Sequence, residues 1–184
     1  WTTLGAFYAF QEAAGKLGIS ADVSSVYASY PVTTDFNGIL AAKSGCRMNV
    51  RGEIDIYVPK DTDNDVTVNY VDEQKKTTSL YEADQLETRD KYAVFLGGNT
   101  SVIDIKTMAE NRDRLLVVKD SYANCFVPFL TPYFREIVMI DPRYYTGNIQ
   151  EAMETYQITD VLFLYSGNTF FQDNNISGAL GSEQ

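Results

Sequence analysis

Ser121 lies where many serine enzymes hold their nucleophile, at a junction between a strand and a helix. It follows the apolar run 115–118 and precedes small and polar residues that predict a helix running toward Pro128. Unpaired backbone N–H groups in the first turn of a helix can stabilise the oxygen that becomes negative during acyl transfer. A serine at this position is also a common N-cap in proteins that catalyse nothing. Both interpretations of Ser121 therefore stay open.

A serine hydroxyl needs a base before it becomes an effective nucleophile. The 184 residues contain no histidine, so the usual partner of a catalytic serine is missing from this chain. Lys119 is an alternative base in a Ser–Lys pair, but it is close to Ser121 along the chain and its ammonium would first have to be desolvated. The sequence therefore predicts a nucleophile without supplying its base.

Other polar residues follow the neighbouring predicted strands. Ligands of α/β sheets bind beyond the carboxyl ends of the strands, so these residues are expected to meet at one edge. Asn168 could donate its side-chain amide to an oxyanion, although an Asn after a glycine is also an ordinary turn residue. Arg143 could simply pair with one of the many carboxylates.

These candidates depend on the elements that would carry them. Near-continuous apolar strands are predicted at 92–99, 114–121, 136–141 and 160–168, with a helix at 148–158. Apolar strands that alternate with helices are typical of a parallel sheet covered on both faces. We therefore expect an α/β fold with a mostly parallel sheet flanked by helices.

The N-terminal part follows different patterns. Residues 3–17 have the apolar spacing of a helix, with Thr2 or Thr3 as its N-cap and Gly18 as its stop. Residues 21–46 are irregular and are expected to form short helical pieces and loops.

A β-hairpin excursion is expected around 53–71. Residues 53–58 and 66–71 both alternate between apolar and polar, which predicts two antiparallel strands. Residues 72–90 are polar and are expected to lie at the surface.

The connection within this hairpin is acidic. Asp61, Asp63 and Asp65 have the spacing that begins a calcium loop, but Val66 stands where such a loop has Gly, and no Glu follows at its twelfth position. A solvated turn is the better interpretation, and we expect no metal site.

Composition limits the partners. With 184 residues and 45% apolar content, the chain is expected to form a single domain over 1–184. Lys and Arg number 15 against 25 Asp and Glu, and the net charge of −10 argues against nucleic acid as a partner. No apolar run approaches the roughly 20 residues of a membrane span. Aromatic residues make up 13%, which suits core packing and also the stacking of sugar rings.

Two features leave alternatives open. Cys46 and Cys125 could form a disulfide or remain separate thiols. The first residue is Trp1 and no signal peptide precedes it, so we expect a fragment or a processed product.

The order of motifs resembles the SGNH hydrolase superfamily, in which a serine block follows one strand and an asparagine block follows a later one. The corresponding stretches here are KDS at 119–121, DPRYY at 141–145 and YSGN at 165–168. Lys119 and Thr169 depart from the usual GDS and GxND blocks. The opening WTTLGAFYAFQ resembles the continuation of the motif that names the DHHW family, SGNH-like proteins related to bacterial alginate O-acetyltransferases.

This resemblance implies an SGNH-hydrolase-like, flavodoxin-like fold, with a catalytic Asp and His located just before Trp1. Ser121 then matches the nucleophile and Asn168 the oxyanion asparagine, while Asn99 and Arg143 are candidates for substrate contacts. No cofactor is implied. The chain alone, without a histidine, is expected to be inactive or nearly so.

The function implied by the resemblance is that of a truncated catalytic domain of a serine-dependent carbohydrate O-acetyltransferase or acetylesterase. Its substrate would be a cell-envelope or extracellular polysaccharide, and its location extracellular or at the envelope. The alternative is a non-catalytic protein that binds glycans, or an accessory protein that works with a membrane acyltransferase.

Overall fold

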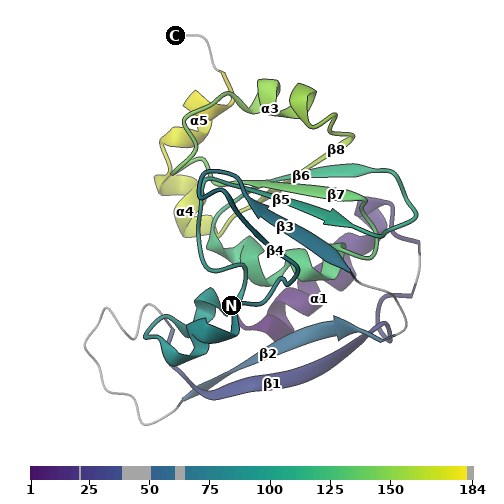
Figure 1. Ribbon diagram of the computed structural model, residues 1–184, viewed down its shortest axis with the longest axis vertical. Coiled ribbons are helices and arrows are strands. Elements are labelled where there is room, and N and C mark those ends of the chain that lie inside the picture. Colours follow the sequence, from purple (N-terminus) through teal and green to yellow (C-terminus); the bar gives the residue numbers. More distant parts are fainter. Residues whose placement is uncertain (21, 39–50, 61–64, 182–184) are drawn as a thin grey trace. The chain divides into compact units, whose positions relative to one another are not determined.

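The computed structural model describes residues 1–20, 22–38, 51–60 and 65–181 (Figure 1). The chain divides into two compact units, Trp1–Thr62 with Tyr81–Gly98, and Asp63–Leu80 with Asn99–Gln184. The expectation of a single domain over 1–184 stays a prediction. No helix of the described ranges is long and apolar enough to cross a membrane.

The first unit contains one longer helix and a two-stranded antiparallel sheet. Its elements are α1 (Thr3–Ala14), η1 (Gly15–Leu17), β1 (Tyr27–Phe36), β2 (Gly52–Pro59), η2 (Ala83–Glu87) and η3 (Lys91–Val94). Helix α1 confirms the predicted N-terminal helix, because Thr2 Oγ1 accepts the N–H of Gly5 at 3.1 Å and Gly18 ends the following turn with φ of 75°. Its apolar face packs on the strands, with Phe7 stacked on Tyr57 at 5.2 Å between ring centroids.

The predicted hairpin is wrong, because its two strands belong to different sheets. Strand β2 pairs with β1, from Tyr27 opposite Pro59 to Phe36 opposite Gly52 (Figure 1). Strand β1 lies inside 21–46, where no strand was expected. Alternation of apolar and polar residues indicates a half-buried strand but does not show which strand it pairs with. Strand β1 was not expected because it contains Pro31, which the strand tolerates next to an irregularity in the register. Of the three aspartates in the acidic connection, Asp61 and Asp63 lie outside the described residues, and Asp65 is exposed.

The second unit is built on a six-stranded sheet in the order β4-β3-β5-β7-β6-β8 (Figure 1). Its elements are β3 (Val66–Tyr70), β4 (Lys75–Thr77), β5 (Val102–Thr107), β6 (Arg114–Lys119), η4 (Ser121–Cys125), η5 (Val127–Leu130), β7 (Glu136–Ile140), α3 (Ile149–Thr155), β8 (Asp160–Leu164), α4 (Gly167–Gln172) and α5 (Asn175–Ala179). Strand β6 is parallel to both β7 and β8. The predicted strands at 114–121, 136–141 and 160–168 and the helix at 148–158 are therefore confirmed.

The sheet is mixed, so the expectation of a mostly parallel flavodoxin-like sheet is wrong. Strands β4, β3, β5 and β7 pair antiparallel. The link 108–113 between β5 and β6 is too short for a crossover helix, so β6 runs opposite to β5. Residues 92–99 form no strand of the sheet: η3 is followed by a turn in which Leu96, Gly97 and Gly98 all have positive φ.

One hydrophobic core cluster of the second unit lies on the face of this sheet that α3 and α5 cover (Figure 1). Its buried members are Val102, Leu116, Val118, Val138, Ile140, Ile149, Ala152 and Ala179. Helix α3 begins at the cap Asn148, whose Oδ1 accepts the N–H of Gln150 at 2.7 Å. This packing fixes the place of β6 and its neighbours in the unit, and with them the residues that follow their ends.

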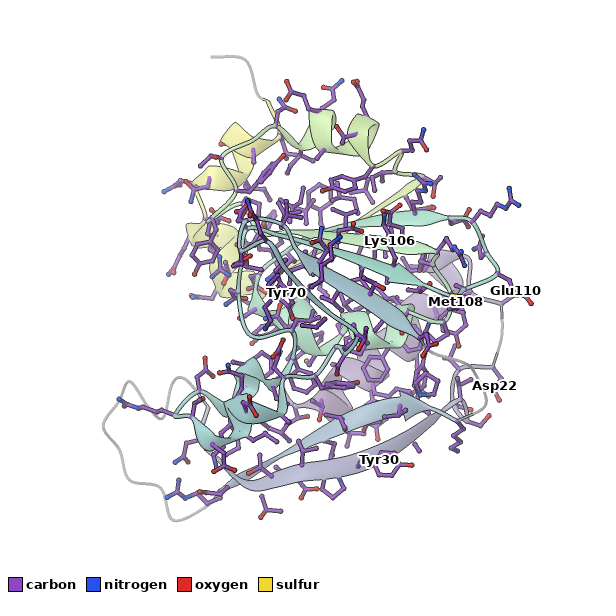
Figure 2. All side chains as sticks on the ribbon, viewed as in Figure 1. Asp22, Tyr30, Tyr70, Lys106, Met108 and Glu110 are labelled. Carbon is purple, nitrogen blue, oxygen red and sulfur yellow. The ribbon has the colours of Figure 1, made fainter. Side chains whose placement is uncertain are left out.

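A buried carboxylate pair lies on the same sheet, away from the carboxyl ends of β6 and β7. Asp104 of β5 and Glu136 of β7 are 7% and 9% exposed, and Lys106 Nζ lies 3.9 Å from Asp104 Oδ2 and 3.8 Å from Glu136 Oε1. Figure 2 labels Lys106 on its strand. Burial and the charge of Glu136 raise the pKa of Asp104 to about 6.

We expect this pair to make stability fall as pH rises. Folding raises the pKa of Asp104, so the stabilisation is fully present below the unfolded value of 3.8 and is lost as pH rises through about 6. In the wild type, the free energy of unfolding should therefore be lower at pH 7 than in acid by on the order of 2 kcal/mol. Asp104→Asn should remove this difference. Urea unfolding from pH 3.5 to 7.5 measures it, with exposed Asp72→Asn as control; an unchanged slope in Asp104→Asn would contradict the assignment.

Candidate functional site

Ser121 is the first residue of η4, and only Asp120 separates it from the end of β6. The N-cap of η4 is Asp120, whose Oδ1 accepts the N–H of Tyr122 at 2.9 Å. Asp120 is 1% exposed, and its Oδ2 accepts the N–H of Ser166 at 3.0 Å. The capping role considered for Ser121 therefore belongs to Asp120, and Asp120 also ties the end of β8 to the segment that carries Ser121.

The backbone donors that follow Ser121 differ from the sequence-based expectation. The N–H of Tyr122 is bonded to the Asp120 carboxylate, and the N–H of Ala123 lies 3.3 Å from the Asp120 carbonyl oxygen. The cap occupies these two groups, so the expectation that unpaired N–H groups here form half an oxyanion hole is wrong for both of them. A short 3₁₀ helix with an Asp cap satisfies its own first turn.

Lys119 is the cation at the centre of a buried polar cluster beside Ser121. Its side chain is 0% exposed, and its Nζ donates to Asn99 Oδ1 at 3.1 Å and to Asn124 Oδ1 at 3.0 Å. The same Nζ forms an ion pair with Asp141 Oδ2 at 3.5 Å. An ammonium has three donors, and these two hydrogen bonds and one ion pair give it three oxygen neighbours.

This arrangement argues against Lys119 as the base for Ser121. Burial lowers the pKa of Lys119 to about 8, and the charge of Asp141 opposes part of that shift. Its Nζ donors face the oxygen atoms of Asn99, Asn124 and Asp141. The Ser–Lys alternative is therefore not supported by the contacts of Lys119.

Arg143 is held by the same aspartate. Its Nε donates to Asp141 Oδ1 at 2.8 Å and its Nη2 to Asp141 Oδ2 at 2.6 Å, a bidentate pair with a carboxylate that is 0% exposed. Arg143 therefore pairs with a carboxylate, which was one of the two roles expected for it from the sequence. Arg143 thus balances the charge of a buried aspartate, and its role as a substrate contact stays a prediction.

Asn99 and Asn168 occupy different environments. Asn99 precedes β5, whose first residue Val102 pairs with the last residue of β7, so Asn99 lies at the edge where the parallel strands end. Its Oδ1 accepts from Lys119 and also from Asn124 Nδ2 at 3.1 Å. Asn168 is exposed on α4 and its Nδ2 donates to Gln172 Oε1 at 3.3 Å. The structure joins Asn99, and not Asn168, to the residues around Ser121.

The sequence reading missed Asn124 and the anchoring roles of Asp120 and Asp141. Asn124 is 1% exposed and bonds to both Lys119 and Asn99. The polar residues on both sides of Ser121 could have indicated these roles. A lysine at the end of a buried strand needs hydrogen-bond acceptors nearby, and these residues supply them.

The fold and the site together define an α/β protein with a serine at the edge of its sheet, flanked by a buried lysine, asparagines and aspartates. A family model described as "DHHW protein" matches residues 1–140. The chain belongs to the DHHW family. No curated protein matches it.

Solved structures of the same fold include a DHHW family protein from Eubacterium siraeum, with 26% identity and a TM-score of 0.82 over 100% of this chain and 62% of that one. Bacillus cereus PatB1 is also similar, with 26% identity and a TM-score of 0.69 over 92% of this chain and 60% of PatB1. PatB1 with a sulfonyl adduct matches at 24% identity, a TM-score of 0.69, and 92% and 58% coverage. The chain thus spans less than two thirds of the length of each of these proteins.

Proposed function

We propose that Ser121 is the nucleophile of an SGNH-type acyl-transfer site related to the alginate O-acetyltransferases, in a protein that acts on acetylated carbohydrate of the cell envelope or the extracellular space. The observation that carries this proposal is the assignment of the helix cap to Asp120. Because Asp120 caps η4, the position of Ser121 at the strand-to-helix junction is not explained by capping. Membership of the DHHW family and the fold shared with PatB1, which has been solved with a sulfonyl adduct, support a nucleophilic site.

In the proposed reaction, Ser121 Oγ attacks the carbonyl carbon of an acetyl ester and its proton passes to a base. The oxyanion intermediate collapses, the C–O bond to the leaving group breaks, and the leaving alcohol takes that proton. The acetyl-serine then passes its acetyl group to a carbohydrate hydroxyl or to water. The chain has no histidine, so we propose that the base belongs to the whole protein outside these 184 residues, as the resemblance to the DHHW motif implies.

Covalent labelling tests this proposal. The protein expressed from its complete gene is treated with a fluorophosphonate and digested with trypsin, which releases the peptide 120–135, where Ser121 is the only serine. We expect one phosphonyl group on this peptide in the wild type and none in Ser121→Ala. Equal labelling of both proteins, or none of the wild type, would contradict the proposal. An unlabelled protein that nevertheless binds acetylated polysaccharide would favour the non-catalytic alternative.

A further inference from the structure

We propose that the first unit contains a binding pocket for a small organic cation of the alkylammonium class. The pocket has a volume of about 280 Å³ and lies between the start of α1, the end of β1, the start of β2 and η3, all within the first unit. Neither Ser121 nor Lys119 lines this pocket, so its ligand does not depend on the proposed acyl-transfer reaction.

Three aromatic residues line the pocket, each from a different element. Trp1 precedes α1 and is 41% exposed, Phe36 ends β1, and Tyr92 belongs to η3. Phe36 pairs with Gly52, and a Cβ atom at Gly52 would lie 3.5 Å from Phe36 Cδ1, so the Phe36 ring lies over this glycine. Tyr92 packs on Phe95 with 5.3 Å between the ring centroids. Aromatic faces carry partial negative charge and attract cations.

The charge at the pocket is negative. Glu53 lines it, and Asp55 of the same strand raises the pKa of Glu53 through a side-chain hydrogen bond and through the repulsion between the two carboxylates. The cations adjacent to lining residues in the sequence, Arg51 and Lys91, pair with Asp35 instead, at 3.2 and 3.5 Å. In the described part of the chain, no lysine or arginine forms an ion pair with Glu53. A bound cation would supply the missing positive charge.

Hydrogen bonds hold the wall of the pocket at the start of α1. The N–H of Asp55 donates to Thr3 Oγ1 at 3.3 Å, which ties β2 to the first turn of the helix, and Thr3 is 6% exposed. Thr2, which also lines the pocket, caps α1 by accepting the N–H of Gly5 at 3.1 Å. A wall that is already in place lowers the entropic cost of binding a small ligand.

The lining favours a cation over other small ligands. A neutral sugar ring could stack on the aromatic residues, but it would leave the carboxylate of Glu53 without a counterion. An anion would be repelled by Glu53 and by the net charge of −10. An alkylammonium satisfies both features, because its methyl or methylene groups pack on the rings while its charge faces the carboxylate.

Calorimetric titration with two probes of the same shape tests this proposal in the protein expressed from its complete gene. Choline carries a quaternary nitrogen, and 3,3-dimethylbutan-1-ol has a neutral carbon in its place, so the comparison isolates the charge. Methyl glucoside is the neutral sugar probe. The variants are Glu53→Gln, which removes the carboxylate, and Phe36→Leu, which removes an aromatic face. Glu12→Gln is the control, because Glu12 is an exposed carboxylate of α1 that does not line the pocket.

We expect choline to bind with a Kd in about the millimolar range and the neutral alcohol to bind at least about tenfold more weakly. Glu53→Gln should lower the affinity for choline about tenfold and Phe36→Leu about threefold, with Glu12→Gln within about twofold of the wild type. Thermal unfolding shows that each variant is folded. Equal affinity for the two probes, wild-type affinity in a folded Glu53→Gln, or binding of methyl glucoside without binding of choline would overturn the inference. A wild type that binds none of the three probes would also overturn it.

Discussion

Ser121→Ala should lower acetyl-ester turnover by about 10³-fold or more in the protein expressed from its complete gene, because removing the nucleophile removes the covalent route entirely. The substitution should leave the fold unchanged. The cap of η4 is the carboxylate of Asp120, which also holds the N–H of Ser166, and neither contact involves the Ser121 hydroxyl. Steady-state kinetics and thermal unfolding of the same preparation measure both effects.

Ser177→Ala is the matched control, since Ser177 is an exposed serine of α5 in the same unit. It should show wild-type turnover. If Ser121→Ala keeps wild-type turnover while remaining folded, Ser121 is not the nucleophile and the polar cluster beside it has a different purpose.

Asp141→Asn should destabilise the protein by about 3–5 kcal/mol, the range expected when one member of a buried ion pair is neutralised. Asp141 is 0% exposed and is the counterion shared by Lys119 and by Arg143. An amide keeps the shape of the side chain but leaves a fully buried ammonium without its ion-pair partner. Urea unfolding at pH 7 measures the loss.

The double variant Lys119→Met with Asp141→Asn distinguishes charge from packing. Removing the buried ammonium removes the unpaired cation, so the double variant should be more stable than Asp141→Asn alone. If the two substitutions are additive instead, Lys119 and Asp141 do not interact energetically, and the cluster is not the charged unit described here.

The alternation of apolar and polar residues predicted elements better than it predicted their partners. Strand β6, strand β8 and helix α1 were predicted from their own apolar patterns, because each contains enough apolar residues in one period. Strand β2 was recognised but assigned to the wrong neighbour, since pairing depends on β1, which is distant in sequence and contains Pro31. Strand β5 was missed because Asp104 and Lys106 interrupt its apolar pattern.

The candidate site was predictable in location more than in detail. Ser121 and Asn99 each follow a predicted strand or turn, and the topology of an α/β sheet brings such residues to one edge of the sheet. The contacts of Asn99 depend on where its side-chain amide points, and its hydrogen bonds with Lys119 and Asn124 decide this. A sequence lists these residues without showing that the lysine is buried and its acceptors are arranged around it.

The most direct test of the central claim is the isolation of the acetyl-enzyme. The protein expressed from its complete gene is mixed with 4-nitrophenyl acetate, quenched in acid during the first turnovers and digested with trypsin. We expect the mass of one acetyl group on peptide 120–135, located at Ser121 by fragmentation, and no acetyl group on this peptide in Ser121→Ala. Catalytic turnover without acetylation of Ser121, at a rate equal in the two proteins, would contradict the account.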